Sequence, residues 1–98
     1  NISSGDGNDH VTVTSSSATQ VQINLGRNED RLDLSNLTAT SIIAHGNDGD
    51  DIFTVQGVKA NDGTFFGDNS FDTYREPIVP PNQIRKFQRI TFERVETF

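Results

Sequence analysis

The stretch Gly46-Asn47-Asp48-Gly49-Asp50-Asp51-Ile52-Phe53-Thr54-Val55-Gln56 decides the fold, because its pattern recurs along the chain. Its first half consists of glycine, asparagine and aspartate, the residue types that best tolerate the left-handed backbone of tight loops. Its second half alternates apolar and polar residues from Phe53 to Gln56, which is typical of a half-buried β-strand. The stretch therefore predicts a tight loop that leads directly into a strand.

An acidic residue marks a repeat of 21 residues. Aspartate recurs at this interval, and the next step falls on a glutamate: Asp9, Asp30, Asp51, Asp72 and Glu93. The position two residues after each acid is apolar or aromatic: Val11, Leu32, Phe53, Tyr74 and Val95. Because independent columns agree on one interval, the repeat is the organising feature of the chain.

Each repeat contains a second short apolar stretch after a polar turn, so it predicts a unit of loop, strand, turn and strand. Such a unit cannot bury its apolar face alone, but it can do so when identical units stack with their strands in parallel. Crossovers between parallel strands favour the right hand. We therefore predict an all-β, right-handed parallel β-solenoid (a β-roll or β-helix) of about four and a half 21-residue coils, with helix nearly absent.

The alternation assigns the core and the coil boundaries. The predicted inward columns are Val11/Leu32/Phe53/Tyr74, Val13/Leu34/Val55, Leu37/Val58/Val79 and Ala18/Ala39/Ala60/Pro81. We expect one domain over residues 1–98, with coils near 4–24, 25–45, 46–66 and 67–87 and a terminal strand in 88–98. We also expect this domain to be a fragment of a larger protein.

Composition excludes several classes of function. The chain of 98 residues carries a net charge of −6, which argues against nucleic acid and anionic membranes as partners. No apolar run approaches the roughly 18 residues of a membrane span, so we expect no membrane insertion. Cysteine is absent, which excludes disulfides and thiolate metal sites.

Two loops resemble a known calcium-binding repeat. Residues 4–12 read SGDGNDHVT and residues 46–54 read GNDGDDIFT, while the loops at 25–33 and 67–75 match less well. These loops resemble the haemolysin-type (RTX) nonapeptide G-G-x-G-x-D-x-U-x, in which U is a large apolar residue. The resemblance implies a parallel β-roll with calcium bound between stacked loops. The chain departs from that family by having one loop per 21 residues, so only one edge could bind calcium.

The resemblance implies a set of calcium-site residues on this edge: Gly5, Gly7, Asp9, Asp30, Gly46, Asp48, Gly49, Asp51 and Asp72. Stacked aspartates about 4.8 Å apart would repel one another by roughly 3.5 kcal/mol at an effective dielectric constant near 20. Calcium, which takes six to eight oxygen ligands, would relieve this repulsion. The alternative is purely structural: each aspartate caps the backbone N–H groups of its own loop. Arg27, which falls between Asp6 and Asp48 in their column, could neutralise the edge without an ion.

Catalytic interpretations are weak, and we expect the chain not to be an enzyme. His10 and His45 are the only histidines, and neither has a second histidine at metal-ligand spacing. No cysteine nucleophile, phosphate-binding loop or G-x-S-x-G motif is present. A loose basic set near the end of the chain is either solvated or a docking surface for the acidic edge of a neighbour: Arg75, Arg85, Lys86, Arg89 and Arg94.

Two hypotheses of function follow. The first is a structural, calcium-linked β-solenoid segment of a secreted or cell-surface bacterial protein, in contact at its ends with the rest of its parent chain or a neighbouring protein. The alternative is a carbohydrate-binding or carbohydrate-active β-helix fragment, which would need an aromatic platform. The candidates for that platform are Phe65, Phe66, Phe71 and Tyr74.

Overall fold

The computed structural model describes residues 2–3, 5, 7–68, 70–78, 82–90 and 92–98. The strands are β1 (Ile2–Ser3), β2 (His10–Asn24), β3 (Arg31–His45), β4 (Ile52–Gln56), β5 (Lys59–Phe66), β6 (Thr73–Glu76), β7 (Gln83–Ile90) and β8 (Arg94–Thr97). The described residues form an all-β solenoid of about four coils and contain no helix. Accordingly, none of them belongs to a helix that could cross a membrane.

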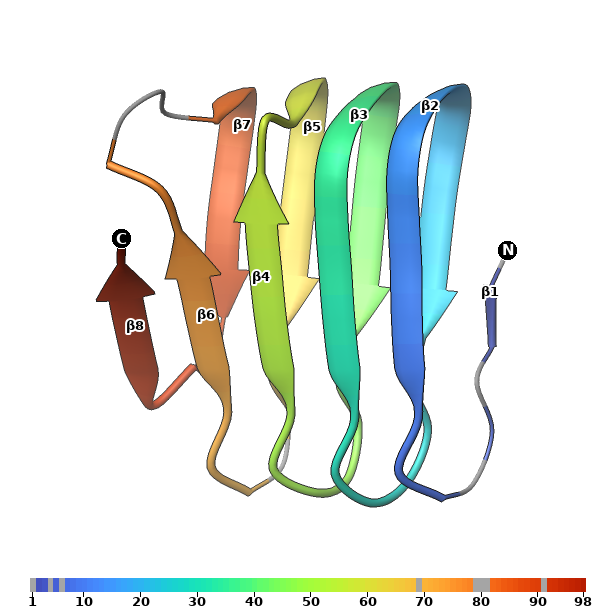
Figure 1. The fold of residues 1–98 in the computed structure, drawn as a ribbon, viewed down its shortest axis with the longest axis vertical. Helices are drawn as coiled ribbons and strands as arrows, with labels where there is room; N and C mark the ends of the chain where they lie inside the picture. Colours follow the sequence, from blue (N-terminus) through green and yellow to red (C-terminus); the bar gives the residue numbers. More distant parts are fainter. Residues whose placement is uncertain (1, 4, 6, 69, 79–81, 91) are drawn as a thin grey trace.

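Strand pairing confirms the predicted stack. Every strand pair is parallel, and one continuous column of partners runs through His10, Arg31, Ile52, Thr73 and Arg94 at the predicted interval. In Figure 1 the near strands run upward, the far strands run downward, and each coil lies to the left of the preceding one. This arrangement is right-handed, as expected for parallel crossovers.

The fourth coil departs from the repeat on its far side. Lys59 pairs with Gln83 and Ala60 with Ile84, an offset of 24 residues, whereas Thr73 and Arg94 on the near side keep the offset of 21. The prediction that Pro81 follows Ala60 in its column is therefore wrong, because three extra residues enter at the turn edge. Pro81 itself lies outside the described residues. The segment between β7 and β8 is correspondingly short, which restores the register at Glu93.

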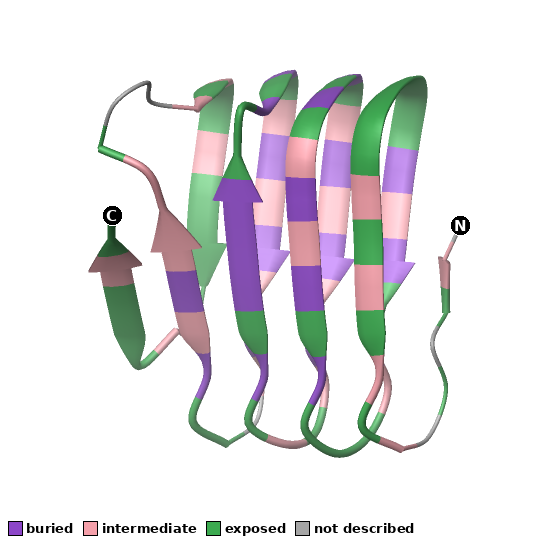
Figure 2. Ribbon diagram, viewed as in Figure 1, coloured by how far each residue is buried: buried purple, intermediate pink, exposed green. Residues whose placement is uncertain are grey.

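The core lies between the near and far strands (Figure 2). Leu32, Phe53 and Tyr74 are fully buried, as predicted, and Val11 and Val13 at the first coil are half-buried. Ala39 and Ala60 are buried, whereas Ala18, which pairs in register with Ala39, is exposed. β1 pairs with β2 only at Ile23 and Asn24, so no described residue pairs with Ala18 on its outer side. Val79, predicted to follow Val58 inward, lies outside the described residues.

Aromatic rings fill the core of the later coils. Phe53 contacts Phe65 and Phe92 edge to face, at ring-centroid distances of 6.3 and 5.1 Å. Tyr74 lies 5.6 Å from the rings of Phe65, Phe87 and Phe92. These geometries are the ones that aromatic pairs prefer. The first two coils are instead filled by aliphatic side chains, so the aromatic share of the core grows towards the carboxyl end of the stack.

Candidate functional site

The repeat acids form one hydrogen-bonded column at the loop edge, here called the acid ladder: Asp9, Asp30, Asp51, Asp72 and Glu93. Each backbone N–H of the first four donates to a carboxylate oxygen of the next acid, at 2.7 to 2.8 Å. The acids therefore cap the backbone of the preceding coil. This arrangement differs from the structural alternative, in which each aspartate caps its own loop.

Main-chain bonds reinforce the acid ladder from the other side. The carbonyl oxygen of each aspartate accepts a hydrogen bond from the residue that begins the next near strand, such as Arg31 N–H to Asp9 at 2.8 Å and Thr73 N–H to Asp51 at 2.9 Å. Asp30, Asp51 and Asp72 thus connect coils through both their main chains and their side chains, whereas Asp9 does so through its main chain. This places the carboxylates in a fixed line along the loop edge.

The second carboxylate oxygen of each aspartate lacks a partner. Asp30, Asp51 and Asp72 are 3%, 0% and 0% exposed, so water does not solvate these groups in compensation. The Oδ2 atoms of all four aspartates are buried and accept no hydrogen bond from any described residue. Such oxygens are costly to bury when charged. The acid ladder therefore favours the uptake of protons or a cation.

Burial changes the acidity of the inner aspartates. Desolvation raises the pKa of Asp51 to about 8, with the charges of its neighbours adding to the effect, and the N–H of Asp30 opposing it. Desolvation likewise raises the pKa of Asp72 to about 7, and that of Asp30 rises for the same reason. The centre of the acid ladder therefore resists ionisation more than ordinary carboxyl groups do.

The loops that carry the acid ladder are built on left-handed residues. Gly5, Gly26 and Gly49 have positive φ, as do several non-glycine loop residues: Asn28, Asn47, Asp68 and Ser70. Close stacking adds a second constraint at Gly49, because a Cβ there would lie 2.0 Å from the carbonyl oxygen of Asn28. At the loop edge the carbonyl oxygen of one coil therefore packs directly against a glycine of the next coil.

Two oxygen atoms lie close to Gly46, between the third and fourth coils. A Cβ on Gly46 would lie 2.6 Å from Asp51 Oδ2 and 2.8 Å from the carbonyl oxygen of Gly67. An unpartnered carboxylate oxygen and a main-chain oxygen of the next coil thus lie beside the same Cα. Hard oxygen donors of these two kinds are the ligands that calcium prefers.

Side chains alone do not make a metal site here. Among the described residues, no three histidine, aspartate or glutamate side chains converge closely enough to bind an ion. A cation at the acid ladder would therefore need loop carbonyls as additional ligands. Arg27 is exposed and forms no ion pair in the described part of the chain, and Asp6, one of the two acids beside it in its column, lies outside the described residues.

The structure places the predicted site residues along one edge, but not equally deep. Asp30, Gly46, Asp51 and Asp72 are buried, whereas Asp9 is half-buried. The other predicted loop residues are half-buried or exposed: Gly5, Gly7, Asp48 and Gly49. The buried members thus belong to the inner three coils.

Further side chains connect the loops, and sequence reasoning missed them. Glu29 N–H donates to Asn8 Oδ1 at 3.1 Å and Phe71 N–H to Asp50 Oδ1 at 2.8 Å. Asp68 Oδ2 accepts from Asn47 N–H at 3.1 Å. These pairs also lie 21 residues apart, with an asparagine or aspartate as acceptor, and the two columns that contain them were the signal available in the sequence.

The remaining candidate residues have structural roles. His10 is exposed and contacts Asp33, and His45 stacks on Phe66 with ring centroids 4.4 Å apart. Three of the basic residues near the carboxyl end pair with Glu76 or Glu96: Arg75, Arg89 and Arg94. Of the platform candidates, Phe65 and Tyr74 are buried in the core, while Phe71 is 52% exposed.

Comparison of the chain with family models, with curated proteins and with solved structures finds no match.

Proposed function

We propose that the chain is a structural β-solenoid segment whose acid ladder binds calcium, and that it works as a rigid extracellular or cell-surface spacer and not as an enzyme. The observation that carries this proposal is the column of four buried Oδ2 atoms without hydrogen-bond partners. Each of these atoms has an uncompensated desolvation cost when its aspartate is ionised. A cation shared between coils would offset that cost and join the coils.

Calcium suits the donors better than a transition metal does. The acid ladder offers only oxygen atoms, and no imidazole belongs to it. Two neighbouring aspartates of the set Asp30, Asp51 and Asp72, together with loop carbonyls, would bind each ion, which would supply positive charge between like-charged carboxylates. Extracellular calcium reaches the millimolar range, which is enough to fill even sites with a Kd of about 10⁻⁴–10⁻³ M. This supports a secreted or surface location.

The ends of the stack are the proposed contacts with other protein. β1 adds only two residues beside β2, and β8 adds four beside β6. Ile90 and Val95 at the last coils are 37% and 46% exposed. Further coils of a parent chain, or a neighbouring protein, would cover such surface in the same parallel register.

A thermal melt in calcium and in chelator tests the calcium proposal. At a calcium concentration ten times Kd, one site adds about 1.4 kcal/mol to the free energy of unfolding. For a chain of this size we therefore expect Tm to rise by roughly 5–11 °C between EDTA and millimolar calcium at constant ionic strength. An unchanged Tm would show that hydrogen bonds alone stabilise the loop edge.

Asp51→Asn is the informative variant. The amide keeps an acceptor oxygen for Asp30 N–H but removes the buried charge. We expect it to raise Tm in EDTA at pH 8, where Asp51 ionises, and to lose most of the response to calcium. Asp33→Asn is the matched control, because Asp33 lies on a near strand and pairs with His10 and Arg31 outside the acid ladder. Equal loss of the response in both variants would count against the acid ladder as the site.

A further inference from the structure

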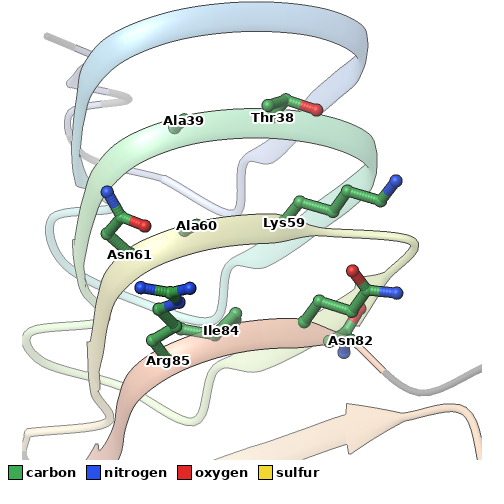
Figure 3. Close-up of a pocket in the computed structure, with 9 residues that line it drawn as sticks. Thr38, Ala39, Lys59, Ala60, Asn61, Asn82, Ile84 and Arg85 are labelled. Atoms are coloured by element: carbon green, nitrogen blue, oxygen red, sulfur yellow. The ribbon is translucent and has the colours of Figure 1, made fainter.

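The turn edge, opposite the acid ladder, carries a cleft of about 440 Å³. It spans three coils, because its lining comes from β3, β5, β7 and the residue before β7: Thr38, Ala39, Lys59, Ala60, Asn61, Asn82, Gln83, Ile84 and Arg85. Ala39 and Ala60, which follow one another in the stack, form the floor of the cleft and have the smallest side chains of its lining (Figure 3). No carboxylate belongs to this lining, although the chain has 14 acidic residues.

The cleft carries two cations without intramolecular partners. Within the described ranges, neither Lys59 nor Arg85 forms an ion pair, and both are exposed. By contrast, four other arginines are paired: Arg31, Arg75, Arg89 and Arg94. The acid nearest in sequence, Asp62, pairs in strand register with Lys86 and does not line the cleft. The cleft is thus a positive region on an acidic chain, and such a region attracts anionic ligands.

The two cations lie at opposite ends of the cleft. Figure 3 shows Arg85 beside Asn61 at one end and Lys59 beside Thr38 at the other, with Ala60 between them. Because Lys59 pairs in register with Gln83, Arg85 lies on the next coil and two residues further along the strand. An extended ligand with negative groups at separate positions would meet both, with its length lying across coils about 4.8 Å apart.

The uncharged lining residues favour a hydroxyl-rich ligand. Thr38, Asn61 and Gln83 provide hydroxyl and amide groups, which both donate and accept hydrogen bonds. The alanine floor offers no deep pocket for the side chains of a peptide. From this geometry we infer that the turn edge binds an anionic oligosaccharide, a chain of uronate sugars, with Lys59 and Arg85 pairing with its carboxylates and the amides contacting its hydroxyls.

Titration of the ¹⁵N-labelled chain with tetragalacturonate, followed by NMR, tests this inference. The buffer contains EDTA, at a temperature where circular dichroism shows the chain folded, so the result does not depend on calcium. We expect saturable shifts in the amide signals of residues 38–39, 59–61 and 83–85. The two tests are independent: a missing response of Tm to calcium would not affect this titration, and a missing response to the sugar would not affect the calcium proposal.

Two double variants with the same net charge distinguish binding in the cleft from a general effect of the charge of the chain. We expect the pair Lys59→Gln and Arg85→Gln to lower affinity at least tenfold. The control pair Arg27→Gln and Lys86→Gln removes two other cations that have no ion pair in the described part of the chain and lie outside the cleft. It should change affinity less than twofold.

Several outcomes would overturn the inference. These are no shift of the named signals at millimolar ligand, equal binding of a neutral oligosaccharide, equal loss in the two variant pairs, or binding of inorganic sulfate or a tetraglutamate peptide as tight as that of tetragalacturonate. Each of them would show that the cleft does not recognise an extended uronate chain.

Discussion

Phe53 is the residue on which the packing of the core most depends. It is fully buried, lies in the middle coils of its column and contacts the rings of Phe65 and Phe92 edge to face. Phe53→Ala would leave a cavity at the junction of the aliphatic and aromatic parts of the core. We expect it to lower the free energy of unfolding by about 3–5 kcal/mol, as buried phenylalanines do. Urea denaturation measures the change.

Val13→Ala provides the comparison, since Val13 is only half-buried at the first coil. It should cost clearly less than Phe53→Ala. A loss below about 1 kcal/mol for Phe53→Ala would contradict the central position of this ring.

Thr54 carries a buried hydroxyl group that forms no hydrogen bond. The residue is 7% exposed, and its Oγ1 has no partner among the described residues. Thr54→Val keeps the branched shape that suits a strand and removes the unsatisfied hydroxyl. We expect the free energy of unfolding to rise by about 1 kcal/mol in a urea melt. Thr12→Val, at an exposed position of the same column, should change it by less than about 0.5 kcal/mol.

At the scale of the element, the acid ladder gives the molecule an unusual pH dependence. The folded pKa values of Asp51 and Asp72, about 8 and 7, lie above the unfolded value of 3.8. The folded state therefore binds more protons than the unfolded state between these values, and its stability falls as pH rises through that window. In EDTA we expect Tm to decrease from pH 5 to pH 8. A Tm that rises over this range would contradict the buried, unpartnered carboxyls.

Asp51→Asn isolates the contribution of one group. Because the amide does not ionise, the decrease of Tm between pH 5 and pH 8 should become shallower. Asp33→Asn serves again as the control and should leave the slope nearly unchanged, since Asp33 lies outside the acid ladder.

The sequence predicted the near strands and their register, but not the hydrogen bonds of the acid ladder or the shift in the fourth coil. The near strands and their register follow from the interval of Asp9, Asp30 and Asp51, since a fixed interval specifies a fixed offset in a parallel stack. The bonding of each acid to the preceding coil could not be predicted, because it depends on where each side chain points within its loop. The shift of Ile84 was also missed, because the added residues at the turn edge are balanced by a shorter loop before Glu93.

At the scale of the whole molecule, the described strands pair only over long sequence separations. Every described pair of strands joins residues 21 or 24 positions apart, and no hairpin is present among them. Loops must therefore close before any sheet contact forms, which slows folding. We expect refolding in milliseconds to seconds, measured by stopped-flow fluorescence of Tyr74 after dilution from urea. Refolding in microseconds would contradict a folding barrier set by these pairings.

The compensated offset in the fourth coil shows how the molecule tolerates changes of length. Three residues are gained at the turn edge between Lys59 and Gln83, yet Arg94 returns to the register of Thr73. The two edges thus differ as sites for protein engineering. A foreign peptide grafted at the turn edge would leave the hydrogen bonds of the acid ladder in place, whereas a graft within the acid ladder would separate an acid from the N–H group of the preceding coil that it caps. Whole duplicates of residues 25–45 would lengthen the stack by one step each, which makes the repeat a molecular ruler that can be extended in units of one coil.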